Sequence, residues 1–499
     1  MTSQPADRVT YPRSLEHEAH EAPGNVDENS APVASSYIAD HLQYSPGTQR
    51  PRHTPRNTSS HTQEARAARR TSAASRAEYD VPDRYANLGE TANIPPVQNP
   101  DEEPIRRYES LEHERAREQG YVRDRQRQNE DPATRAALQA EEKAEAAGYP
   151  VSRTATQIYT LSYLVFFSIL GTLARLGLQA ITVYSGTPII FKSIWPNFAG
   201  SVIMGFLAED RMLFRQEWGS PSPNGTDTEP GSASVDSEGA RKAHLAIKKT
   251  IPLYIGLATG FCGSFTSFSA FMRDVFLALS NDLPAINSPA RNGGHTFLAL
   301  IAIPLITISM SLAGLFFGAH MAIFLEPITP SLPFFFSRKI LDPLVVILGW
   351  GCWLGAVIMS IFPPHDGWRG TATFALVFAP LGCLLRFYIS LRLNSSVPSF
   401  PVGTFAVNIF GTAVLGMSWD LAHVPVGGVI GCQLLQGIQD GFCGCLTTVS
   451  TWVAELAVLR RRHAYIYGAG SVGTGLVMLV AIMGGLRWGD GWNPLVCTH

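Results

Sequence analysis

The sequence predicts an all-α membrane protein made of two inverted four-helix repeats and one linking transmembrane helix, nine spans in total, with the third helix of each repeat broken. Three observations lead to this prediction. The composition changes abruptly near residue 150, long apolar runs recur after that point, and a set of short motifs appears twice in the same order. The averages hide these features, because the 499-residue chain has a formal net charge of only −2.

Residues 1–150 form the first predicted domain, a disordered cytoplasmic tail. This stretch is rich in Arg, Glu, Gln, Ser, Pro and His, and it contains few Leu, Ile or Phe residues. A segment of this composition cannot bury enough apolar surface to offset the entropy of the unfolded chain. A solvated tail is therefore favoured over a segment that binds a specific partner.

The apolar runs after residue 157 are each close to the ~20 residues that a helix needs to cross the hydrocarbon layer of a bilayer. No water-soluble core of this size would use so many. The nine predicted spans are 157–184, 189–209, 251–280, 295–324, 340–362, 370–392, 400–421, 427–459 and 464–487.

The third and eighth spans are longer than a bilayer requires, and each carries a glycine cluster near its middle. The clusters read GFCGS at 260–264 and GFCGC at 441–445. They predict broken helices, because unwound backbone is tolerated at membrane depth where protein or water satisfies its polar groups.

Basic residues are concentrated in alternate loops, which predicts the orientation of the chain. By the positive-inside rule, these loops are cytoplasmic. The amino-terminal tail is then cytoplasmic and the carboxy terminus lies outside. The residues concerned are Arg211, Arg215, Arg241, Lys242, Lys248, Lys249, Arg338, Lys339, Arg392 and Arg460 to Arg462.

The seven cysteines predict neither a disulfide framework nor a zinc site. Their number is odd, and six of them lie inside apolar runs, where cysteine behaves as a small buried hydrophobic residue. These six are Cys262, Cys352, Cys383, Cys432, Cys443 and Cys445.

Comparison of the sequence with itself reveals an internal repeat. GTLARLGL around Arg175 corresponds to APLGCLLRFY around Arg386, and each arginine precedes an asparagine, Asn197 or Asn408, by 22 residues. GFCG then occurs identically at 260–263 and 441–444. Chance does not align so many features in order with matching spacings.

The span between the repeats explains why the number of spans is odd. Each repeat has four spans, so two repeats joined directly would insert in the same direction. The fifth span inverts the second repeat, and the charge bias of the loops agrees. An inverted repeat places binding or permeation sites near the midplane between its halves. The predicted domains are residues 151–330 (first repeat), 331–364 (linking helix) and 365–499 (second repeat). A linking helix that also lines the site is the less favoured alternative.

These ordered motifs (GxxxR, NxxG, and GFCG followed by a Thr/Ser/Phe-rich stretch) resemble the fluoride channels of the bacterial CrcB/Fluc type. The tandem form with a linking helix resembles the fungal fluoride exporters, and the resemblance covers about residues 157–487. It implies a double-barrelled channel with a structural Na⁺ at its centre. By the same resemblance, the metal ligands would be the backbone carbonyls of Gly263, Thr266, Gly444 and Thr447.

The chemistry of the side chains is consistent with an anion pathway. Phe268 and Phe271 lie on one helix face, and the positive edges of their rings can hold an anion without a full charge that would trap it. By resemblance these are the two channel phenylalanines; packing is the alternative. Amide and hydroxyl groups add hydrogen-bond donors. The remaining predicted channel-lining residues are Asn197, Asn408, Ser269, Thr448 and Ser450.

Arg175 and Arg386 have two interpretations. Near helix ends, they can attract an anion into the vestibules of the channel. Alternatively, they reach the lipid headgroups or pair with other parts of the protein.

The second repeat departs from the family pattern. Val449 and Trp452 stand where the first repeat has Phe268 and Phe271, and valine has no ring edge. The first repeat departs too, with Ser264 and Phe265 in place of the usual Gly and Leu. We therefore expect one working and one degenerate pore.

The function expected from the sequence is passive export of fluoride through a selective channel, which confers fluoride resistance. The spans contain no Walker motif and no nucleophile with a nearby base, so an enzyme is not expected. No nucleic-acid partner is expected either. The channel would work as a monomer, an intramolecular pseudo-dimer, in the lipid bilayer of the plasma membrane. The alternatives are a proton-coupled transporter and a membrane scaffold. A coupled transporter needs an acidic group within a helix core, whereas Glu209, Asp274, Asp440 and Glu455 are expected toward span ends.

Overall fold

The computed structural model describes residues 151–184, 187–214, 248–283, 292–333, 335–363, 365–397, 399–424 and 427–497. The regular elements of these residues are helices, as the sequence predicts, and all of them belong to one compact unit. The predicted disordered tail, residues 1–150, lies outside the described residues.

The first repeat begins with two helices, α4 and α5. Ser152 caps α4 by accepting a hydrogen bond from the Ala155 amide, and α5 has Pro196 in its first turn, where a missing N–H costs nothing. The third helix is interrupted and the fourth is continuous. Their bounds are α4 Arg153–Thr182, α5 Ile194–Glu209, α8 Pro252–Ile255, π-helical η3 Gly256–Cys262, α9 Gly263–Phe265, α10 Phe268–Leu279 and α11 Gly293–Leu325.

The second repeat has the same order of four helices, preceded by two short elements, α13 and η5, that the described residues of the first repeat lack. Its third helix is again interrupted after a π-helical turn, a feature that is frequent at functional sites. The bounds are α13 Asp366–Trp368, η5 Arg369–Thr373, α14 Phe374–Leu393, α15 Val402–Ala422, α16 Gly428–Gly437, η6 Ile438–Cys443, α17 Gly444–Leu446, α18 Ser450–Val458 and α19 Arg461–Gly489.

Eight helices of the described residues are long and apolar enough to cross a membrane. The ninth predicted span, 189–209, corresponds to α5, which has only 16 residues. A helix of that length extends about 24 Å, less than the hydrocarbon thickness. Residues 189–193 enter α5 as irregular chain, and the Ser193 amide donates to the Asp274 carboxylate (3.1 Å).

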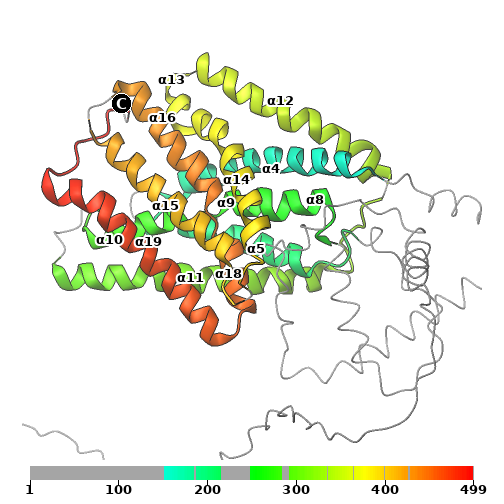
Figure 1. Ribbon diagram of the computed structural model, residues 1–499, viewed down its shortest axis with the longest axis horizontal. Coiled ribbons are helices and arrows are strands. Elements are labelled where there is room, and N and C mark those ends of the chain that lie inside the picture. Colours follow the sequence, from blue (N-terminus) through cyan, green and yellow to red (C-terminus); the bar gives the residue numbers. More distant parts are fainter. Residues whose placement is uncertain are drawn as a thin grey trace, which may run out of the picture. The chain divides into compact units, whose positions relative to one another are not determined.

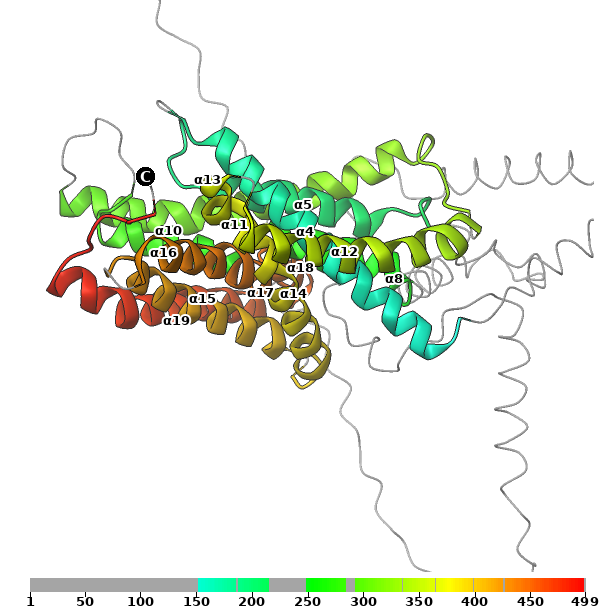
Figure 2. The same cartoon turned by 90° about the horizontal axis from the view of Figure 1, so that it is seen from above.

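The linking helix runs along the outside of the bundle. It consists of η4 (Phe336–Leu341) and α12 (Asp342–Ile361) and packs on α4 and α14 (Figures 1 and 2). Tyr163 Oη donates to the Asp342 carboxylate (3.0 Å), and Trp350 Nε1 donates to Ser162 Oγ (3.0 Å). These bonds fix α12 to the first helix of the first repeat.

Helices α5 and α11 pack so closely that glycine is required at their interface. A methyl group at Gly205 would overlap the Leu315 carbonyl, and one at Gly318 would overlap the Val202 carbonyl. Small residues at such interfaces let two membrane helices approach backbone to backbone.

The two repeats exchange their half-helices at the centre of the molecule. Helix α10 of the first repeat packs against α15 and α19 of the second, whereas α18 of the second packs against α5 and α11 of the first. Figure 1 shows the short turns of this region between the long helices. The core therefore lies where the interrupted helices meet.

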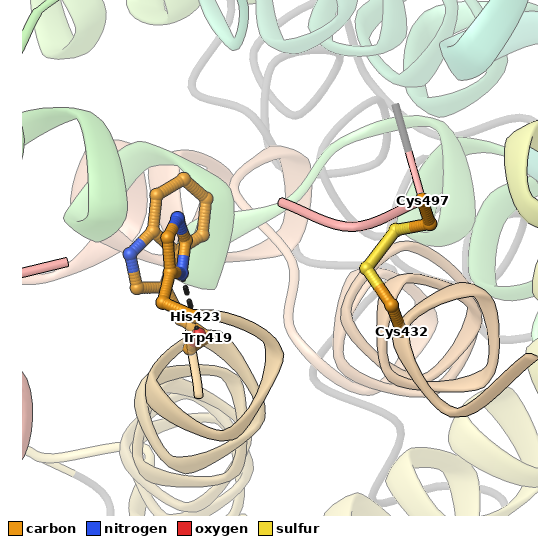
Figure 3. Close-up of a disulfide and its surroundings, with 4 residues drawn as sticks. All are labelled: Trp419, His423, Cys432 and Cys497. Atoms are coloured by element: carbon orange, nitrogen blue, oxygen red, sulfur yellow. Dashed lines mark hydrogen bonds between the residues drawn. A yellow bond between two sulfur atoms is a disulfide. The ribbon is translucent and has the colours of Figure 1, made fainter. Parts of the chain in front are cut away.

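The prediction that the cysteines form no disulfide is wrong for Cys432. Its sulfur is bonded to that of Cys497, which lies beyond the last apolar run, so the tail after α19 is tied to α16 (Figure 3). Cys262, Cys383, Cys443 and Cys445 are buried and form no disulfide, as predicted, while Cys352 is exposed on α12 and also forms none.

Candidate functional site

Both interrupted helices break at a threonine. Thr266 has φ −93° and ψ 151°, and Thr447 has φ −95° and ψ 150°. In the first repeat the extended residues Thr266 and Ser267 separate a short helical turn from the half-helix that follows. In the second repeat three residues, Thr447 to Val449, do so, and Val449 has φ −97° and ψ −38°. The two breaks thus begin with the same backbone geometry, although they lie 181 positions apart in the sequence and differ in length by one residue.

The two predicted asparagines hold the breaks open. Asn197 Oδ1 accepts a hydrogen bond from the Ser267 amide (2.9 Å), and Asn408 Oδ1 accepts one from the Thr448 amide (2.9 Å). In an uninterrupted helix these amides would donate to the carbonyls four residues earlier, those of Gly263 and Gly444. The asparagines therefore divert the helical donors from both glycine carbonyls.

The threonine carbonyls lose their helical donors in the same way. The Ala270 amide, which would donate to the Thr266 carbonyl, donates to Ser267 Oγ (3.2 Å). The Thr451 amide, which would donate to the Thr447 carbonyl, approaches Thr448 Oγ1 (3.5 Å).

The amides that would donate to the four carbonyls of the predicted metal site in a continuous helix thus bond to side chains instead. Carbonyl oxygens suit a hard cation. The described residues contain no group of three or more His, Cys, Asp or Glu side chains that could hold a metal ion, so a cation at the centre would depend on the backbone. The donor set fits Na⁺.

The two threonine hydroxyls cap the half-helices of the opposite repeats. Thr266 Oγ1 accepts from the Val449 and Ser450 amides (3.2 and 3.1 Å) at the start of α18. Thr447 Oγ1 accepts from the Ser269 amide (3.0 Å) at the start of α10. The free N–H groups of each half-helix are therefore satisfied across the boundary between the repeats.

The predicted lining residues Ser269, Thr448 and Ser450 belong to this central cluster. Ser269 Oγ lies 3.0 Å from Thr447 Oγ1, while Thr448 Oγ1 and Ser450 Oγ lie 3.2 and 3.1 Å from Thr266 Oγ1. Their hydroxyls thus bond to protein partners where the repeats cross.

The asparagine side chains differ in one respect. Asn408 Nδ2 donates to the Thr448 carbonyl (3.2 Å), whereas Asn197 Nδ2 is buried and has no hydrogen-bond partner. An unpaired buried donor is costly unless a ligand or water satisfies it. Asn197 is therefore the asparagine with a donor to spare.

Three aromatic rings meet next to the centre. The ring centroids of Phe268 and Phe271 lie 5.6 Å apart with the planes at 84°. Trp452, from the second repeat, lies 5.3 Å from Phe268 with the planes at 72°. All three side chains are fully buried, and Trp452 Nε1 donates to Ser471 Oγ (3.3 Å). Edge-to-face packing of this kind turns ring edges toward neighbouring groups.

Arg175 and Arg386 are buried and reach across to the opposite repeats. Arg175 donates to the Ser264 carbonyl (2.9 Å) and to the Asp440 carbonyl in η6, and Arg386 donates to the Thr259 carbonyl in η3 (2.5 Å). Their exposed fractions are 2% and 0%. The structure thus places both guanidinium groups against backbone carbonyls of the protein, which is the pairing with other parts of the protein given in the second interpretation.

Two buried carboxylates occupy equivalent positions that the sequence analysis assigned to span ends. Asp274 and Glu455 follow Phe268 and Val449 by six residues each, and they are 3% and 4% exposed. Glu455 accepts from Thr404 Oγ1 (2.6 Å) and Tyr467 Oη (2.7 Å). An alignment of the two half-helices in the sequence would have shown that Asp274 and Glu455 occupy equivalent positions.

Comparison with known proteins places the chain among a defined set of relatives. The family model described as "CrcB-like protein, Camphor Resistance (CrcB)" matches residues 162–319 and 373–485, two stretches that leave out α12. Fluoride export protein 1 of Neurospora crassa is 58% identical over 460 residues, which is 87% of each chain.

More distant relatives match smaller parts. Fluoride export protein 1 of Candida albicans is 32% identical over 343 residues, 66% of this chain and 80% of that protein. The fluoride-specific ion channel FluC of Pseudomonas paraeruginosa is 35% identical over 119 residues, which is 23% of this chain and 91% of the bacterial protein. No solved structure matches the chain.

Proposed function

The chain belongs to the CrcB-like family, and from this premise we propose that it is a fluoride-selective channel that exports fluoride passively from the cytoplasm. The observation that carries the proposal is the pair of interrupted helices with equivalent breaks, found in a chain 58% identical to a fluoride export protein. Export needs no ATP, because an anion gains about 2.3 kcal/mol per 100 mV on leaving a cell with a negative interior.

We further propose the inverted nine-span topology, with α5 as the short second span. The cross-repeat capping by Thr266 and Thr447 supports it, since each repeat completes the break of the other. The disulfide supports an external carboxy terminus, because disulfides persist in oxidising compartments. The plasma membrane is the compartment where export of this kind protects a cell.

The centre between the repeats is the proposed Na⁺ site. Gly263, Thr266, Gly444 and Thr447 would hold the ion through their carbonyls, and the bound charge would fix the crossing of the breaks. The chain's own contribution is to keep these oxygens free. Asn197 and Asn408 do so for the glycines by taking the amides of Ser267 and Thr448.

The conducting pathway is proposed to pass the rings of Phe268 and Phe271. It would run beside α10, between α15 and α19, and ring edges would replace part of the water lost by the anion. Asn197, whose Nδ2 has no hydrogen-bond partner, lies on α5, which packs against α18 and so belongs to the other half. The half around Val449 would be the degenerate pore, so a single chain would conduct through one pathway.

A fluoride electrode and proteoliposomes loaded with potassium fluoride test the proposal. A channel gives fast efflux only after valinomycin relieves the charge that builds up. Efflux that follows an imposed pH gradient without valinomycin would instead indicate proton coupling, in which case Asp274 and Glu455 are the buried acids to substitute. No efflux under either condition would contradict both.

A further inference from the structure

The segment after α19, residues 490–497, has no part in the proposed pathway, yet it is fixed at three points. Its end is bonded to α16 through Cys432–Cys497. Its first half is held by the Trp492 ring, and the end of α19 from which it continues is held by Arg487, which forms a bidentate pair with Asp282 (2.7 and 2.8 Å). We call residues 490–497 the C-terminal strap.

Trp492 lies among groups from three different helices. Its ring centroid is 6.1 Å from Phe276 on α10, 5.6 Å from Trp419 on α15, and 5.7 Å from the Arg487 guanidinium on α19. The His423 ring, just after α15, lies 5.3 Å from the Trp492 ring with the planes at 32°, and Trp492 Nε1 donates to Asp420 Oδ1 (3.3 Å).

These three helices are the ones that border the proposed pathway. Phe276 lies eight residues after Phe268 on the same helix, so it is about 12 Å farther along α10. Trp492 therefore lies over the end of the pathway that the proposed topology places outside the cell. The strap crosses from α19 over this end to α16, and Figure 3 shows the disulfide on α16 together with Trp419 and His423 of the neighbouring α15 region.

We propose that the C-terminal strap is a cover over the outer exit of the pathway, and that Cys432–Cys497 is a redox-modification site that controls it. External small-molecule thiols are the substrates. A thiolate attacks Sγ of Cys497, which is partly exposed, and Cys432 leaves as a thiolate. A second thiol resolves the mixed disulfide, so that two cysteine thiols form and two external thiols become one disulfide.

Loss of the bond removes the tether that closes a 65-residue loop. Trp492 still keeps its ring contacts and one hydrogen bond, but the strap is no longer bonded to α16. The strap leaves the exit for part of the time, and fluoride efflux becomes faster. This inference rests on the proposed function and on an external carboxy terminus.

The test uses the full chain in proteoliposomes with fluoride inside and membrane-impermeant reduced glutathione outside. Glutathione should raise the valinomycin-supported efflux rate several-fold, and mass tagging with an impermeant maleimide measures how much of the disulfide was reduced. The double variant C432S/C497S should show the raised rate without glutathione and should not respond to it. The matched control Cys352→Ser, on the outer surface of α12, should respond like the parent protein.

Trp492→Ala provides an independent measurement. In the oxidised protein it should raise efflux as reduction does, and reduction should add nothing to it. If the disulfide is reduced and efflux is unchanged or slower, the cover does not exist. If the parent protein conducts no fluoride in either redox state, the proposed function fails instead.

Discussion

Gly263 of the first repeat lies directly against the guanidinium group of Arg386 from the second repeat. A methyl group on Gly263 would overlap the Arg386 guanidinium, and one on Gly444 would overlap that of Arg175. Neither clash falls on the flexible end of an exposed side chain, because both arginines are buried. The second glycine of each GFCG motif thus leaves the space that the arginine guanidinium of the other repeat occupies.

Gly263→Ala should therefore lower the free energy of unfolding by about 1–3 kcal/mol, the usual cost of overpacking. Arg386→Ala in the same chain should recover part of this loss, because it vacates the space that the methyl group needs. Thermal unfolding in detergent measures both variants. Simple additivity of the two losses would show that the residues are not coupled.

The rings test the asymmetry between the two halves. Phe268→Ile together with Phe271→Ile should abolish fluoride efflux, since both rings that offer positive edges to the anion are lost from the pathway. Val449→Ala should conduct like the parent. Fast efflux from the double isoleucine variant would reject a pathway past these rings.

His423 introduces a dependence on external pH. Its pKa is lowered by burial, although its bond to the Trp419 carbonyl opposes the shift. A histidine whose pKa is lower in the folded protein takes up its proton more readily when unfolded, so stability rises with pH through the window just below the usual value of about 6.5. The melting temperature should fall on acidification through this window.

The control for this prediction is His423→Gln, which should remove that part of the pH dependence. The charged neighbours are Asp420, Arg273 over Trp419, and Arg487 over Trp492. An unchanged pH profile in the variant would assign the effect to one of these groups.

At the scale of the element, α12 differs from the other long helices. It contacts α4 and α14, the first helices of the two repeats, and it lies away from the central cluster. Replacing its lipid-facing residues Ile347, Leu354 and Ile358 by other apolar residues should leave efflux unchanged.

Deleting residues 336–361 should abolish efflux, because the second repeat would then insert in the same direction as the first. Accessibility labelling of the loop after α15 measures the orientation of the second repeat.

Much of this architecture could be predicted from the sequence. Periodic motifs located both breaks, and the spacing from arginine to asparagine located the residues that hold them. The bonds from Arg175 to the Asp440 carbonyl and from Arg386 to the Thr259 carbonyl could not be predicted, since each joins one repeat to the other. The disulfide was missed because Cys497 lies outside every apolar run, and its approach to Cys432 depends on the path of the strap.

For the whole molecule, the central carbonyls predict a requirement for sodium. Replacing Na⁺ by N-methylglucamine on both sides should abolish efflux and lower the melting temperature. A ligand present at 100 times its dissociation constant stabilises a fold by about 2.7 kcal/mol, so the shift should grow with Na⁺ concentration. Equal stability in both salts would exclude a structural sodium ion.

The reach of Arg386 into the first repeat also bears on biosynthesis. The first four helices are synthesised well before residue 386, so Gly263 lacks its Arg386 partner until the second repeat has been made. Half of the protein is thus incomplete until the other half is inserted, and a truncated product that ends after α11 would be a substrate for quality control rather than a small channel.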